Sequence, residues 1–105
     1  MSLEVFLIKE GKKELVNNLT GVDLELEGEG ANLNLTGFLS REPRGEVVSL
    51  QKDFFKKVNL DLLVKDSISG LAWELPACEV TQISFTAWEL PGATSYRLVL
   101  FSKSI

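Results

Sequence analysis

The residues best suited to binding chemistry gather in the last third of the chain. Both tryptophans, Trp73 and Trp88, and the only tyrosine, Tyr96, lie there. Large amphipathic rings dominate ligand pockets and protein interfaces. We therefore predict a ligand-binding set of Trp88, Glu89 and Tyr96, suited to a carbohydrate or a peptide, and interface positions at Trp73 and Trp88. The alternative for both tryptophans is packing in the core of a small β domain.

The two tryptophans belong to an internal repeat. Ala72–Pro76 reads Ala-Trp-Glu-Leu-Pro and returns as Ala87–Pro91. If each proline sits at a turn, one strand lies between the two copies, and consecutive strands joined by short turns run antiparallel. Trp73 and Trp88 would then lie near opposite ends of the sheet. This separation weakens the carbohydrate-binding hypothesis within one chain, whereas contact between chains of an oligomer would restore it.

A shorter repeat, Asn-Leu-Thr-Gly, occurs at Asn18–Gly21 and again at Asn34–Gly37. Asparagine and glycine favour turns, so we interpret the repeat as similar chemistry at strand ends rather than as a duplication. Both copies also match the N-glycosylation acceptor pattern. Nothing at the N-terminus resembles a signal peptide, so we expect these acceptors to be unused.

The chain offers few groups for catalysis. It has no histidine, which is the commonest general base and metal ligand, and a single cysteine, Cys78. Without histidine no Cys–His pair can activate the thiol, and one cysteine cannot form an internal disulfide. Glu74 and Glu89 could serve as a glycosidase carboxylate pair, but the antiparallel arrangement would keep them apart. We predict no enzymatic activity, no cofactor and no metal site.

An acidic row is the remaining candidate for ion binding. It consists of Asp23, Glu25, Glu27 and Glu29. Clustered carboxylates could bind calcium or a cationic partner, but alternate strand residues lie about 7 Å apart and no loop curls them around an ion. We favour a solvated strand face whose charge discourages aggregation through the sheet edge.

The overall charge excludes several classes of partner. The 105 residues carry 11 Lys and Arg against 15 Asp and Glu, a net charge of −4. Nucleic acids and anionic membrane surfaces both select basic patches, so neither is an expected partner. No apolar run approaches the roughly 20 residues of a membrane-spanning helix. We expect the protein to be cytoplasmic or to lie inside a particle.

Alternation of apolar and polar residues defines the first strands. Leu3–Lys9 is a predicted strand, followed by a turn at Glu10-Gly11 and a return over 14–19 as a strand or one helical turn. Val22–Glu27 alternates perfectly, and a second alternating run follows around Leu33. This pattern predicts a hairpin with a glycine-rich loop of about three or four residues.

Strands also account for most of the second half. Val58–Lys65 is a predicted strand, and 49–57 stays open between an extended segment and one short amphipathic helix. Three last strands are expected over 71–75, 79–90 and 94–102, separated by prolines. The final strand is apolar at nearly every position, which predicts burial on both faces and a central place in the sheet.

These elements predict an all-β fold. Residues 1–105 should form a single-domain antiparallel β-sandwich or jelly-roll-like barrel of about seven to nine short strands. Part of it, Ile83–Trp88 and Tyr96–Val99, resembles the first half of a fibronectin type III domain, where a strand ending in tryptophan, a turn with proline and a Tyr-x-Val strand follow one another. The rest of such a domain would follow Tyr96, but the sequence ends at Ile105. The similarity is therefore local, and no family is recognised over the whole chain.

Three functions remain open. The leading hypothesis is a non-catalytic structural or assembly module that forms a homo-oligomer, as bacteriophage virion or tail components do by analogy of fold. The first alternative is a β-sandwich that binds a glycan or a peptide through Trp88. The second alternative is an accessory domain that docks on another protein by adding a strand at a sheet edge.

Overall fold

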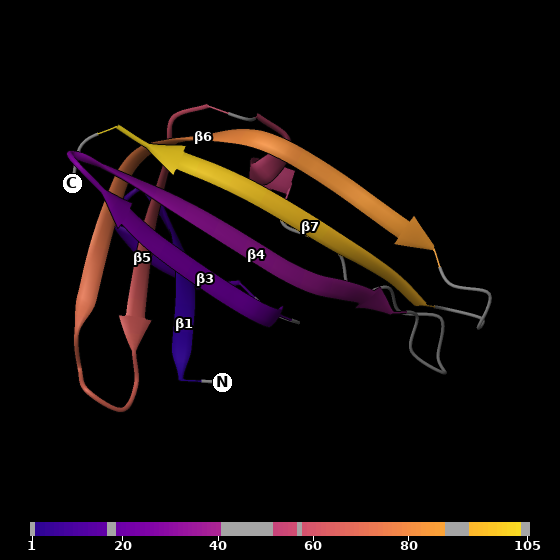
Figure 1. The fold of residues 1–105 in the computed structure, drawn as a ribbon, viewed down its shortest axis with the longest axis horizontal. Coiled ribbons are helices and arrows are strands. Elements are labelled where there is room, and N and C mark those ends of the chain that lie inside the picture. Colours follow the sequence, from indigo (N-terminus) through magenta and orange to yellow (C-terminus); the bar gives the residue numbers. More distant parts are fainter. Residues whose placement is uncertain (1, 17–18, 41–51, 57, 88–92, 104–105) are drawn as a thin grey trace.

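The computed structural model describes residues 2–16, 19–40, 52–56, 58–87 and 93–103. This part of the chain is almost entirely β, which confirms the predicted fold class: it holds seven antiparallel strands and one short 3-10 helix (Figure 1). In chain order the elements are β1 (Leu3–Lys9), β2 (Lys12–Leu15), β3 (Leu19–Glu27), β4 (Gly30–Ser40), η1 (Lys52–Lys56), β5 (Leu60–Asp66), β6 (Ala72–Ala87) and β7 (Ala93–Ser102).

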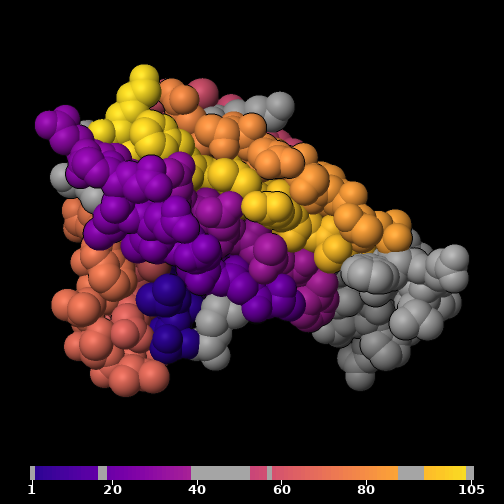
Figure 2. Space-filling model, viewed as in Figure 1, coloured from indigo at the N-terminus to yellow at the C-terminus, as the bar shows by residue number. Residues whose placement is uncertain are grey.

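The strands form one open sheet in the order β2-β1-β5-β6-β7-β4-β3. The long strand β6 stands in the middle of this order and takes part in both halves of the sheet, because its residues 72–78 pair with β5 and its residues 79–87 pair with β7. We call β2, β1, β5 and the start of β6 the back half, and the end of β6 with β7, β4 and β3 the front half. Figure 2 shows the front half as a continuous surface, with β1 emerging beneath it.

A bulge at Pro76-Ala77 lets β6 continue where the sequence suggested a break. Leu62 pairs with Leu75 and Leu60 with Cys78, so β6 carries one more residue than β5 at this point. Ala77 adopts a left-handed φ of 49°, and its backbone N–H donates to Asp61 Oδ1 at 3.0 Å. A bulge leaves one residue out of the ladder and so tolerates proline. The prediction of separate strands over 71–75 and 79–90 was therefore wrong, because 72–87 form one strand of 16 residues; 88–90 lie outside the described residues.

The two halves face each other across one hydrophobic core. From the back half it receives Val5, Leu7, Leu60, Leu62, Val64, Leu75 and Cys78, and from the front half Ala31, Leu33, Leu35, Tyr96, Leu98 and Leu100. Val16 and Phe54 complete it. The core residues of β1, β4, β5 and β7 are of one parity within each strand, as period-two alternation requires.

The hairpins follow the predicted turn chemistry with one difference. Glu10 and Gly11 both take positive φ, 51° and 79°, as the favoured two-residue hairpin turn demands, and β1 has the predicted bounds. The second hairpin, β3–β4, turns through Gly28-Glu29, a shorter loop than predicted. At Gly30 a side chain would meet the carbonyl oxygen of Ser102 at 2.9 Å, so glycine is needed there for close approach to β7.

Two further expectations concern β7 and residues 49–57. β7 lies between β6 and β4, which confirms an interior place in the sheet. Burial on both faces was wrong, because Val99 and Phe101 on the outer face are only half-buried and Arg97 is exposed. The helical alternative for 49–57 corresponds to η1, while 49–51 and 57 lie outside the described residues. No helix among the described residues is long and apolar enough to cross a membrane.

Candidate functional site

The predicted aromatic site is only partly within the described residues. Trp88 and Glu89 lie outside them, so the set of Trp88, Glu89 and Tyr96 stays a prediction. Trp73 lies near the start of β6 opposite Val64 and is half-buried against the core. Since Ala87 ends β6, Trp73 and the residues leading to Trp88 stand at opposite ends of this strand.

Tyr96 lies inside the protein rather than on an open face. It stands on β7 between Gly37 of β4 and Phe85 of β6, and it is only 3% exposed. Its hydroxyl oxygen is buried, and no hydrogen bond to it is formed within the described residues. Burial raises the pKa of the phenol above its ordinary value of 10.0. A buried hydroxyl without a partner costs stability, so Tyr96 is an unusual core residue.

Cys78 is equally enclosed, next to the bulge. Its side chain is 1% exposed, and the thiol donates a hydrogen bond to the carbonyl oxygen of Leu75 at 3.2 Å. Burial, which disfavours the charged form, raises the pKa of the thiol to about 12. A neutral, inaccessible thiol has little nucleophilic character.

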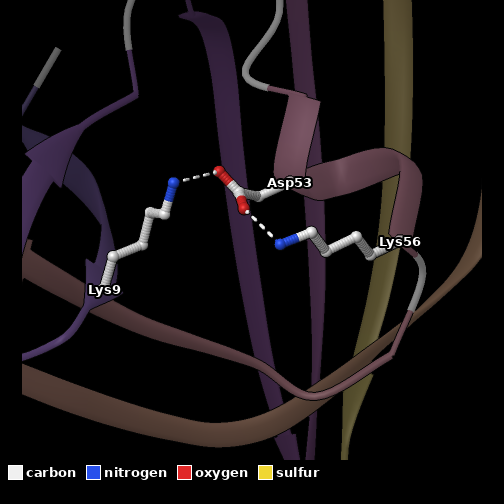
Figure 3. A network of polar contacts seen from close by, with 3 residues as sticks. All are labelled: Lys9, Asp53 and Lys56. Atoms are coloured by element: carbon white, nitrogen blue, oxygen red, sulfur yellow. Dashed lines mark ion pairs between the residues drawn. The ribbon is translucent and has the colours of Figure 1, made fainter.

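A small charged network joins η1 to β1. The carboxylate of Asp53 accepts from Lys9 Nζ and from Lys56 Nζ, each at 3.0 Å (Figure 3). Hydrogen bonds from Lys56 and then from Lys9 lower the pKa of Asp53, and the bond to Asp53 raises the pKa of Lys9. A lysine with a raised pKa stays protonated and is a poor nucleophile. The network therefore anchors η1, whose Phe54 side chain is fully buried in the core.

The acidic row lies on the outer face of the front half. On neighbouring strands Asp23 lies opposite Asn34, Glu25 lies opposite Asn32, and Thr36 lies opposite Arg97. Most of these polar side chains line a shallow hollow of about 570 Å³, formed by Gly21, Val22, Asp23, Glu25, Asn34, Thr36 and Arg97. Within the described ranges no group of three or more Asp, Glu, His or Cys residues could hold a metal ion.

The back half carries apolar residues on its outer face as well. Leu15, Phe6 and Leu63 stand opposite one another on β2, β1 and β5, and we call them the outer apolar row. Leu15 is 41% exposed, and Phe6 and Leu63 are half-buried. Their sequence neighbours Leu7 and Leu62 point to the core and are at most 2% exposed. The outer apolar row is therefore a second hydrophobic surface, separate from the core.

Charged side chains flank the outer apolar row. On one side of it Lys13, Ile8 and Asp61 stand level across three strands. On the other side Glu4 stands opposite Lys65. Glu74 on β6 is level with Leu63 and so lies in line with the row. In the described part of the chain none of these five charged side chains forms an ion pair. Several of them border a hollow of about 710 Å³, whose lining includes Ile8, Lys13, Asp61, Leu63, Lys65, Ala72 and Glu74.

The sequence contained a signal for the outer apolar row that our predictions did not use. Val5-Phe6-Leu7-Ile8 and Leu62-Leu63-Val64 are apolar at both parities, which means apolar side chains on both faces of β1 and β5. Which of these residues meet could not be predicted, because it depends on the register between β1, β2 and β5.

No protein-family model matches the chain, and no curated protein matches it.

Proposed function

We propose that this protein is a non-catalytic assembly module that associates with copies of itself through the outer face of the back half. The outer apolar row is the observation that carries the proposal. An antiparallel sheet that faces water normally presents polar residues on that side. Here Leu15, Phe6 and Leu63 run across three neighbouring strands, and burying them against another surface would remove apolar area from water.

The chemistry of the described residues supports a non-catalytic role. The Cys78 thiol is buried and neutral, and the Asp53 carboxylate is occupied by two lysines. The exposed carboxylates Asp23, Glu25 and Glu27 lie along a strand and do not converge. These polar groups are thus spread over the surface rather than gathered around a reacting atom.

Sedimentation velocity over a concentration series tests the proposal. We expect the wild-type weight-average mass to rise between about 10 μM and about 1 mM, the range of weak association. Phe6→Gln with Leu63→Gln should reduce this rise, because it removes apolar area from the outer apolar row. Ile68→Gln is the matched control, since Ile68 is 85% exposed in the β5–β6 turn. A wild-type protein that stays monomeric over the whole range would contradict the proposal.

A further inference from the structure

We infer that two copies pack face to face about a two-fold axis that lies along the outer apolar row, and that Asp61 of each copy then pairs with Lys65 of the other. This inference rests on the proposed self-association and specifies its geometry. Asp61 and Lys65 are both on β5, two residues before and two residues after Leu63.

The spacing on β5 makes this face self-complementary. Alternate residues of a strand are about 7 Å apart, so the carboxylate and the ammonium lie at similar distances on opposite sides of Leu63. A two-fold axis through the row exchanges its two sides, as an isologous interface requires. Asp61 of one copy then faces Lys65 of the second, and the pair occurs twice. Lys13 is brought toward Glu4 of the second copy by the same operation.

The twist of the sheets does not disrupt this pairing. Packed sheets align within about 30° and lie about 10 Å apart. At about 7 Å from the axis, a crossing of about 30° displaces the facing groups by about 4 Å, which a lysine side chain can span. The lysine and aspartate side chains together can also bridge the separation between the sheets. Leu63 and Phe6 lie on the axis and meet their own counterparts.

The free edges of the sheet suit self-association less well. β2 spans four residues and offers few backbone groups. β3 spans nine residues, but Asp23, Glu25 and Glu27 all project from one face of it. Two copies of β3 paired about a two-fold axis would bring these carboxylates together on that face, and like charges on neighbouring strands repel. The charges therefore favour the face of the back half over either edge.

The size of the face predicts a weak complex. β1, β5 and residues 72–78 of β6 are each about 23 Å long and β2 is about 13 Å long, so at about 4.8 Å apart these strands cover roughly 390 Å² in projection. A standard stable interface buries about 800 Å² on each partner. We therefore expect a dissociation constant of tens of micromolar or weaker, and a dimer rather than a larger assembly, because a two-fold contact closes on itself.

Charge reversal with rescue in a mixture tests the geometry. Asp61→Lys and Lys65→Glu should each weaken the dimer by about tenfold, since each sets like charges against each other at two places. An equimolar mixture of the two variants should restore dimerisation to within about threefold of wild type. In the mixed dimer the lysine introduced at position 61 faces the glutamate introduced at position 65, and the native pair of Asp61 with Lys65 is kept at the second place. Sedimentation equilibrium with one variant fluorescently labelled measures this heterodimer directly.

Controls separate the possible outcomes. Arg97→Glu makes the charge change of Lys65→Glu on the outer face of the front half and should leave the dimer unchanged. Asp61→Asn keeps an acceptor for the Ala77 N–H, so it separates loss of the ion pair from damage to the bulge. If wild type dimerises but the mixture shows no rescue, this geometry is overturned while self-association stands. If wild type is monomeric throughout, the proposed function itself fails.

Discussion

The hydroxyl of Ser102 donates a hydrogen bond to the carbonyl oxygen of Pro76 at 2.7 Å, although the two residues are 26 positions apart. Ser102 ends β7 and is 1% exposed, and Pro76 begins the bulge of β6. The bond therefore joins the last residue of the front half to the point where β6 passes from one half to the other. The bulge is held from its other side by Asp61, which accepts from Ala77.

Ser102→Ala should destabilise the protein by about 1 kcal/mol, because it leaves the partly buried carbonyl oxygen of Pro76 without this donor. Urea unfolding followed by tryptophan fluorescence measures the change. Ser95→Ala is the matched control on the same strand. Ser95 donates to the Thr86 carbonyl oxygen at a longer 3.3 Å in an exposed position, so its loss should cost less. Equal costs at both positions would show that the Pro76 bond does not support the bulge.

Tyr96→Phe should leave stability unchanged or raise it by about 1 kcal/mol, because it removes a buried hydroxyl that lacks a hydrogen bond. The ring that fills the core is kept. Thermal unfolding compares the variant with wild type, and Tyr96→Leu, which loses the ring, should be clearly less stable. A loss of more than about 1 kcal/mol in Tyr96→Phe would mean that the hydroxyl has a favourable partner in solution.

Native Cys78 should resist labelling by a thiol reagent at pH 8. A rise of the pKa from 9.0 to about 12 lowers the thiolate fraction on the order of a thousandfold, and burial also blocks access. In denaturant the thiol should react fully. Stability should also fall as pH rises from about 9 toward about 12, because the unfolded thiol ionises while the folded one does not. Cys78→Ala should lose this part of the alkaline decline.

Asp53→Asn should lower the melting temperature at pH 7 by about 2–5 °C, since it removes two partly exposed ion pairs. The folded pKa of Asp53 lies below its ordinary value of 3.8, so its contribution is present above that pH and is lost as pH falls through the folded pKa. The difference between wild type and variant should therefore shrink below pH 3.8. Melting curves between pH 7 and pH 2 give this comparison, and a constant difference would contradict the assignment.

Glu74→Gln should strengthen the inferred dimer by about twofold to threefold. Glu74 is level with Leu63, so the two-fold axis along the outer apolar row brings it near its own counterpart. Removing one charge from each copy relieves that repulsion. Glu79→Gln makes the same change in the front-half portion of β6 and should have no effect. Weaker association in Glu74→Gln would place the axis elsewhere.

Local patterns were enough to predict most of the strands. The alternation in Val22–Glu27 and the pair Glu10-Gly11 specify a strand and a turn by themselves, and the structure confirms both. Pro76 was misinterpreted because its missing N–H resembles a strand end. Whether a proline ends a strand or occupies a bulge depends on the neighbouring strand, here on Asp61 and Ser102, which the local sequence does not reveal.

The candidate surface was harder to predict than the fold. Large aromatic side chains are common in binding sites, and we therefore predicted roles for Trp73 and Tyr96. In the structure Trp73 packs against the core and Tyr96 is buried within it. The outer apolar row is made of ordinary leucine and phenylalanine residues from three strands. It becomes a surface only when Phe6 is set opposite both Leu15 and Leu63, and that register depends on pairing across the whole chain.

The sharing of β6 between both halves bears on how the chain reaches this structure. β1 must find β5, with Leu3 pairing Asp66, and β4 must find β7, with Ala31 pairing Ser102. Such distant partners make loop closure slow, and topologies of this kind fold on the scale of milliseconds to seconds. Each half includes part of β6, so a fragment that contains only one half should not fold by itself. Amide exchange in β6 should accordingly require opening of the entire molecule, whereas β2 and β3 can fray alone.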